Sequence, residues 1–170
     1  MKTPILLALM VAAALATTAC SKSGTAKAAK ANTDHKPAPV LVLPDEQGNT
    51  IRLADFKGKV VVLNFWATWC GPCKFEIPWL IEFQRQYKDQ GFSVIGVSMD
   101  EGGWPAVRPF LEEAKTNYPI LLGTDETAAA FGGIEVLPTT FIIDRQGRIT
   151  STHMGLTGKD DFENAIKAAL

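Results

Sequence analysis

The sequence contains few cysteines and histidines, the usual ligands of a structural zinc ion. Its 170 residues include three cysteines and two histidines. A structural zinc site needs about four ligands at characteristic spacings. The two histidines, His35 and His153, stand at no such spacing from each other or from a cysteine. We therefore predict no metal site and no bound cofactor.

An excess of positive charge is also missing. The chain has 17 basic and 18 acidic residues, a formal net charge of -1. Without the charged residues that precede Pro37, 12 basic and 17 acidic residues remain, so the rest of the chain carries about -5. Nucleic-acid binding requires a basic surface that neutralises phosphates. We therefore exclude nucleic acid as a partner.

No apolar run in the sequence is long enough to span a bilayer comfortably, which takes about 20 residues. An apolar run at residues 5–16 follows the positive charge of Lys2 and is itself followed by small residues at 17–19. A positive end, a short apolar run and small residues are typical of a secretory signal peptide. We assign residues 1–19 to a signal peptide of the lipoprotein type.

Cys20 directly follows this segment, an arrangement that resembles the lipobox of bacterial lipoproteins. In a lipobox the cysteine is acylated and becomes the mature N-terminus, although Thr17 stands where leucine is usual. The alternative is ordinary cleavage near Ala16 or Ala19, which would leave a soluble periplasmic protein with a free thiol. We favour a lipid anchor at Cys20 on the periplasmic side of a bacterial membrane. Residues 20–38 have no large apolar side chain and are predicted to form a flexible tether.

The other two cysteines, Cys70 and Cys73, come directly after a strand-forming run at 60–65. Residues three apart lie on one face of a helix, and at a helix N-terminus two such sulfurs can form a disulfide. Cys70 would lie at the helix mouth, where unpaired N–H groups and the macrodipole stabilise a thiolate, and we interpret it as the attacking sulfur. Cys73, one turn inside, would resolve the mixed disulfide. A structural disulfide or half of a zinc site is the alternative, but the strand-to-helix context favours redox chemistry.

Two stretches carry a resemblance to a known family, residues 64–73 (NFWATWCGPC) and residues 137–144 (LPTTFIID). With the order of elements between them, they resemble the TlpA/ResA-like family of membrane-tethered, extracytoplasmic thiol-disulfide oxidoreductases. The resemblance covers residues 39–170 and implies one α/β domain with a thioredoxin-like fold. We expect a central mixed β-sheet flanked by helices, with an N-terminal hairpin and a strand-helix insertion.

The hydrophobic pattern predicts an order of elements that agrees with this fold. Residues 60–65 and 91–98 are nearly all apolar, as expected of strands buried on both faces, and residues 104–115 have helical periodicity. The remaining expected elements are a hairpin at 40–53, a strand at 120–122, a helix at 127–131, strands at 139–143 and 148–154, and a helix at 159–169.

The resemblance also implies a client-binding region beside the cysteines. Pro138 matches a proline that is cis in thioredoxin folds and packs beside the cysteine pair. The backbone of Leu137 would then be free to pair with an extended client strand. Trp69 would add an apolar contact, while Gly71 and Pro72 form the dipeptide that thioredoxin has between its cysteines. Pro72 also suits the first turn of a helix.

Glu76 is the candidate proton acceptor. It lies one helical turn beyond Cys73, so its carboxylate could take the proton of the buried thiol when that thiol attacks. ResA-like proteins have a glutamate at this position. Asn64 stands where thioredoxin has a buried aspartate, so the sequence lacks that acceptor. The alternative is an exposed glutamate that interacts only with the helix dipole.

We therefore predict an extracytoplasmic reductase of protein disulfides that works through a mixed disulfide on Cys70. Its partners would be disulfide-bearing client proteins and, because the compartment is oxidising, a membrane electron donor of the DsbD or CcdA type. Some relatives act in cytochrome c biogenesis. Residues 135–140 lack the Ala-Pro-Glu pattern of that branch, so the client stays open.

Three alternative functions use related folds. A disulfide oxidant or isomerase differs in its reduction potential, and the Gly-Pro dipeptide favours a reductant. A peroxidase would need a Thr-x-x-Cys context, but Thr68 is only two residues before Cys70. A copper-binding module would need Cys-x-x-x-Cys and a supporting histidine, and the spacing here is one residue shorter.

Overall fold

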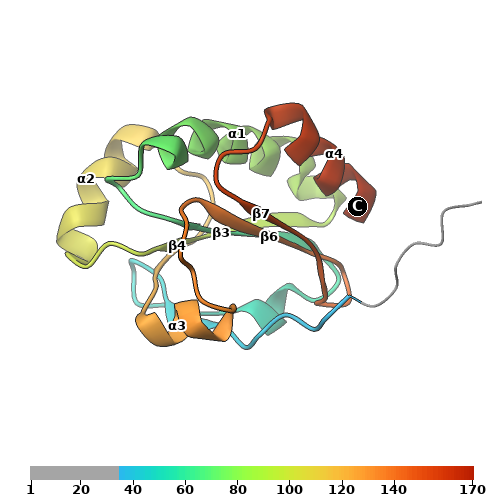
Figure 1. The fold of residues 1–170 in the computed structure, drawn as a ribbon, viewed down its shortest axis with the longest axis horizontal. Coiled ribbons are helices and arrows are strands. Elements are labelled where there is room, and N and C mark those ends of the chain that lie inside the picture. Colours follow the sequence, from blue (N-terminus) through green and yellow to red (C-terminus); the bar gives the residue numbers. More distant parts are fainter. Residues whose placement is uncertain (1–34) are drawn as a thin grey trace, which may run out of the picture. The chain divides into compact units, whose positions relative to one another are not determined.

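The computed structural model describes residues 35–170, which form a mixed sheet with helices on both faces (Figure 1). The sheet has five strands in the order β5-β4-β3-β6-β7. On one side of β3, β4 pairs parallel to β3 and β5 pairs parallel to β4. On the other side, β6 pairs antiparallel to β3 and β7 pairs antiparallel to β6. The bounds are β3 (Val60–Trp66), β4 (Phe92–Ser98), β5 (Ile120–Leu122), β6 (Thr139–Ile143) and β7 (Ile149–Met154). The predicted thioredoxin-like α/β architecture is therefore present.

Helices cover both faces of the sheet, which explains why every residue of β3, β4 and β6 is buried. Figure 1 shows α1 (Gly71–Tyr87), α2 (Trp104–Ala114) and α4 (Lys159–Ala169) on one face. The short α3 (Asp125–Ala130) lies on the other face with the N-terminal segment. Alternate residues of β3 accordingly enter two cores, with Val60 and Val62 in one and Val61 and Leu63 in the other.

The predicted hairpin is present as β1 (Val42–Pro44) and β2 (Thr50–Arg52), which pair antiparallel. Asp45 organises its turn, because one carboxylate oxygen accepts the N–H groups of Gln47 and Asn49 and the other accepts the side-chain amide of Asn49. A bridge from Asp45 to Leu121 joins the hairpin to β5. Short 3-10 helices, η1 (Leu53–Phe56) and η2 (Lys88–Gln90), complete the connections before β3 and β4.

Several predicted boundaries differ from the structure, and two of the differences have a cause that the hydrogen bonds show. Helix α3 begins at Asp125 rather than at residue 127, because the Thr124 hydroxyl caps it by accepting the Thr127 N–H at 3.2 Å. The ordered domain begins before residue 39. Lys36 C=O accepts the Ile149 N–H, and Ala38 N–H donates to Gly147 C=O, each at 2.9 Å. Residues 36–38 of the predicted tether are therefore held against the β6–β7 turn by main-chain hydrogen bonds.

Several predictions concern the N-terminal segment. The predicted signal peptide at residues 1–19, most of the predicted tether and the predicted anchor residue Cys20 lie outside the described residues. In residues 35–170, no helix is long and apolar enough to cross a membrane.

Candidate functional site

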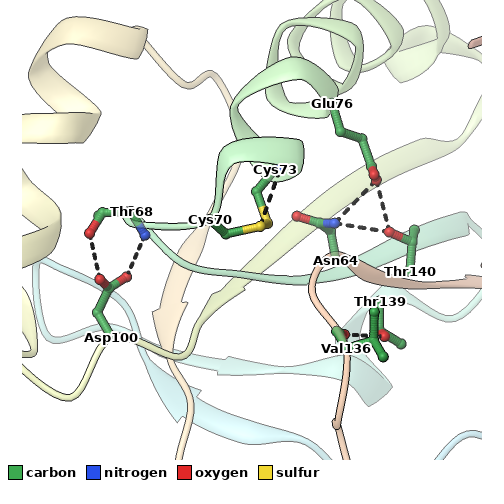
Figure 2. The surroundings of a disulfide bond; sticks show 9 residues. All are labelled: Asn64, Thr68, Cys70, Cys73, Glu76, Asp100, Val136, Thr139 and Thr140. Carbon is green, nitrogen blue, oxygen red and sulfur yellow. Dashed lines mark hydrogen bonds between the residues drawn. A yellow bond between two sulfur atoms is a disulfide. The ribbon is translucent and has the colours of Figure 1, made fainter. Parts of the chain in front are cut away.

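The cysteine pair lies where β3 passes into α1. Cys70 is the N-cap residue of α1, and Pro72 lies in the first turn. The two sulfurs form a disulfide, and the backbone N–H of Cys73 donates to Cys70 Sγ at 3.2 Å (Figure 2). A sulfur at a helix N-terminus that already receives an N–H is well placed to carry negative charge after reduction. Cys70 is 4% exposed and Cys73 1% exposed, so a client sulfur must reach into the site.

Glu76 lies on the buried side of α1, so the alternative of an exposed glutamate is wrong. Its Oε1 accepts hydrogen bonds from Asn64 Nδ2 at 3.2 Å and from the Thr140 hydroxyl at 2.9 Å. Asn64 Nδ2 also donates to Thr140 Oγ1, which closes a triangle between β3, α1 and β6 (Figure 2). Burial raises the pKa of Glu76 to about 7, and the hydrogen bond from Thr140 partly opposes that rise.

Both of these hydrogen bonds reach the same oxygen of Glu76. Within residues 35–170, the other oxygen, Oε2, makes no hydrogen bond. The proton of the neutral acid therefore belongs on Oε2, because Oε1 is engaged with two donors. With a pKa near neutrality, this carboxyl group can exchange that proton under physiological conditions.

Thr140 was not among the predicted site residues. It faces Asn64 because β3 and β6 pair in a register that sets these two residues opposite each other. The two are 76 positions apart in the sequence, so no local pattern marks the contact. Thr140 lies two residues after Pro138 in the sequence. The backbone of β6 therefore connects the Glu76 triangle directly to the proline segment.

Asp100, directly beyond β4, holds the loop that precedes Cys70. Its carboxylate accepts the Thr68 N–H at 2.9 Å and the Thr68 hydroxyl group (Figure 2). It also accepts the hydroxyl group of Ser98. The bonds to Thr68 fix this residue, two residues before Cys70. The sequence offered no signal for this contact, because Asp100 lies 32 residues beyond Thr68.

The predicted cis proline is present, at the Leu137-Pro138 bond. The Thr139 hydroxyl donates to Val136 C=O at 2.6 Å, and the Gly155 N–H donates to Pro138 C=O at 2.7 Å. Neither the N–H nor the C=O of Leu137 has a hydrogen-bond partner within residues 35–170. The proline segment is thus held on both sides of Leu137, while the Leu137 backbone groups stay available.

A groove of about 430 Å³ runs from the cysteine pair to the proline segment. It contains four of the predicted client-binding residues, whereas Pro138 is not part of its wall. Trp69, 70% exposed, stands at its rim. The lining residues are Trp69, Cys70, Gly71, Pro72, Met99, Ile134, Glu135 and Leu137.

His153 lies away from this chemistry, on β7, where its ring packs against Phe162 of α4 at 5.4 Å. Partial burial lowers the pKa of His153. Among the described residues, no cluster of three or more histidine, cysteine or carboxylate side chains could hold a metal ion.

Comparison with known proteins identifies the family of this chain. The profile of the AhpC/TSA family matches residues 35–152, more than half of the chain. The chain belongs to the AhpC/TSA family. Its family relatives include the thiol-disulfide oxidoreductase ResA of Bacillus subtilis, 38% identical over 133 residues that cover 76% of this chain and 74% of the relative. The resemblance predicted from the two motifs is therefore confirmed.

A second ResA, from Geobacillus kaustophilus, is 36% identical to this chain over 168 residues. The match covers 99% of this chain and 94% of the relative. Among solved structures, a thiol:disulfide interchange protein of the thioredoxin family from Chlorobium tepidum is 33% identical, with a TM-score of 0.74. The match covers 82% of this chain and 99% of that structure. The predicted thioredoxin-like fold is confirmed by this likeness.

Proposed function

We propose that the chain is an extracytoplasmic thiol-disulfide oxidoreductase that reduces disulfides in client proteins. One observation carries the proposal. The Cys70–Cys73 disulfide caps the N-terminus of α1 and shares a groove with Leu137, whose backbone is unpaired within residues 35–170. The ResA relatives, which are named thiol-disulfide oxidoreductases, support the same chemistry.

The reaction starts from the reduced pair. The Cys70 thiolate attacks one client sulfur, so a Cys70–client bond forms, the client disulfide breaks, and the other client sulfur leaves as a thiolate that takes up a proton. Cys73 then attacks Cys70 Sγ and releases the second client sulfur. Two electrons pass to the client, and the pair is left as the disulfide present in this structure.

Glu76 would serve the second step. The Cys73 thiol must lose its proton before it attacks, and a carboxylate with a pKa near 7 can accept it at neutral pH. Oε2 is the oxygen available for this transfer, since Asn64 and Thr140 both donate to Oε1. These two residues act as positioning residues that hold the carboxyl group on the buried side of α1.

Client binding would use the groove and the proline segment. An extended client segment can add to the free N–H and C=O of Leu137 as a strand adds to a sheet edge, which demands little of the client sequence. Trp69 would cover the apolar part of that segment. Gly71 and Pro72, both exposed beside Cys70, leave room for the client backbone.

The direction of electron flow depends on the reduction potential of the Cys70–Cys73 couple. We expect the purified chain, titrated against defined ratios of reduced and oxidised dithiothreitol, to give a value near the roughly −270 mV of thioredoxin. Such a value fits a reductant that is re-supplied by a membrane donor of the DsbD or CcdA type. A value near the roughly −120 mV of a strong oxidant would instead assign the chain to disulfide formation or isomerisation.

We also propose that Cys20 carries the membrane anchor, after removal of residues 1–19. Two or three acyl chains would hold the protein firmly at the membrane, whereas one would bind marginally. In bacteria that produce the full chain, wild-type protein should require detergent for extraction, while Cys20→Ala should be released in soluble form. Soluble wild-type protein after export would contradict the anchor and favour ordinary signal-peptide cleavage.

A further inference from the structure

Several large apolar side chains are exposed around the disulfide. Trp69 directly precedes Cys70, and Phe75 lies two residues after Cys73. Val136 lies two residues before the cis proline. Leu156 follows Gly155, whose N–H donates to Pro138 C=O. Single exposed apolar residues need no explanation, but several gathered at one place indicate a binding surface. Trp69 belongs to the groove already described, whereas Phe75 and Leu156 do not line it.

Phe75 and Leu156 lie on the same side of the site, the side of β7 and α4. Phe75 and Glu82 are seven residues apart, two turns along one face of α1. Lys159, the first residue of α4, donates to Glu82 Oε2 at 2.7 Å. This ion pair ties the loop between β7 and α4, which contains Leu156, to the helix face that carries Phe75. The groove opens on the other side, between the end of β4 and the segment before β6.

The fold does not account for Phe75. The buried positions of α1 are Cys73, Glu76, Ile77, Leu80, Phe83 and Tyr87. Phe75 lies off this face and is 65% exposed, so it contributes little to either core. Phenylalanine is also only a moderate helix former. Neither packing nor helix propensity therefore explains a large aromatic side chain two residues beyond Cys73.

The chemistry determines what can cover this surface. The Cys70 residue is only 4% exposed, yet its sulfur must bond to a client sulfur. The residues that flank the client cysteine must therefore lie against the residues that surround Cys70. Client residues on one side of that cysteine can enter the groove, and those on the other side pass toward Phe75 and Leu156. Both of these side chains are uncharged and apolar, so they favour apolar client residues.

We propose that Phe75 and Leu156 form a second client-contact surface, which selects disulfides whose cysteine is flanked by apolar residues in an extended segment. This inference rests on the proposed function and specifies its substrate class. Segments of this kind are exposed in polypeptides that have not finished folding, since folded proteins bury most of their large apolar side chains. Small hydrophilic disulfides would react without help from this surface.

The test compares two synthetic peptides that contain the same intramolecular disulfide, one with leucine and phenylalanine beside the cysteines and one with serine and glutamine. We expect the reduced full chain in detergent to reduce the apolar peptide about tenfold faster at low peptide concentration, the ratio that 1.4 kcal/mol of binding provides. In Phe75→Ser/Leu156→Ser this preference should fall to about one- to twofold, through a higher KM at unchanged kcat. Phe75→Leu should keep most of it.

Two controls separate binding from folding and from reactivity. Val40→Ser removes an apolar side chain that is more exposed than Phe75 or Leu156, in the segment before β1, and should leave the peptide preference intact. The rate of reaction with oxidised glutathione should be the same in all variants, because that small hydrophilic disulfide does not need the surface. A preference that survives in the double variant, or a loss of rate that is equal for both peptides, would overturn the proposal.

The remaining outcomes also decide the matter. Self-association of the wild-type chain that disappears in the double variant would assign the surface to a second copy and overturn the client proposal. Binding to phosphatidylcholine vesicles that falls in the double variant would assign it to lipid, with the same consequence. If neither peptide nor any protein disulfide is reduced by the wild type, the proposed function itself fails, which this assay distinguishes from equal reduction of both peptides.

Discussion

Replacing Cys73 with serine is expected to abolish turnover and to trap the client on Cys70. The variant keeps the attacking sulfur at the N-terminus of α1, so the first exchange still proceeds. The serine hydroxyl cannot displace the client sulfur, and the mixed disulfide persists. Steady-state reduction of a protein disulfide should fall by at least about a thousandfold, as expected when a nucleophile is removed. Non-reducing electrophoresis of the variant with a client should show a covalent adduct that dithiothreitol removes.

Matched variants assign the two sulfurs. Cys70→Ser should lose turnover to the same extent but form no adduct, because Cys73 is 1% exposed and lies inside the helix. Cys20→Ser should retain the exchange rate, since its thiol has no part in the proposed cycle. An adduct formed by Cys70→Ser and absent from Cys73→Ser would reverse the roles of the two sulfurs. Full turnover by either variant would contradict the dithiol mechanism.

The parts of this site that are local in sequence could be predicted. A buried strand that ends four residues before Cys70, with Pro72 in the first turn, determines a strand-loop-helix unit with both sulfurs at the helix N-terminus. The cis state of the Leu137-Pro138 bond could not be derived from physical pattern, because cis is a minority state of any X-Pro bond. It came from the resemblance of the two motifs to a known family.

The contacts that are distant in sequence could not be predicted. Thr140 meets Asn64 and Glu76 only through the register of β6 against β3, and Asp100 reaches Thr68 only because β4 lies beside β3. Hydrophobic periodicity identifies strands and their buried faces, but it does not specify which residues stand opposite each other. The burial of Glu76 has the same origin. Its position one turn after Cys73 was apparent, while the partners that hold it belong to two separate strands.

Those partners make Glu76→Gln the most informative substitution in the polar part of the site. Glutamine keeps the acceptor oxygen for Asn64 and Thr140 but cannot take a proton from Cys73. We expect the release of client from the mixed disulfide to slow by about a hundredfold at pH 7, the lower end of general-base contributions. The first exchange on Cys70 should be much less affected, so stopped-flow measurements should show the mixed disulfide accumulating.

The pH dependence gives a separate signature. In the wild type, the rate of release should rise as the Glu76 carboxyl group ionises and level off above its pKa of about 7. In Glu76→Gln the rate should rise only with ionisation of the thiol itself, toward about pH 8.5. Glu112→Gln, an exposed change on α2, should behave like the wild type. Equal rates of release by wild type and Glu76→Gln between pH 6 and 8 would exclude Glu76 as the proton acceptor.

The same carboxyl group should also make the oxidised protein less stable as the pH rises. Burial raises the pKa of Glu76 from 4.5 to about 7, so between these values the folded state holds a proton that the unfolded state has lost. The free energy of unfolding therefore decreases through this interval by up to about 3 kcal/mol, and the decrease is complete above the folded pKa. Urea unfolding of Glu76→Gln should lack this contribution, so its stability relative to the wild type should improve from pH 5 to pH 8. A parallel pH dependence in the two proteins would mean that Glu76 is ionised in the folded protein already at pH 5, and it could not then serve as an acceptor tuned to neutral pH.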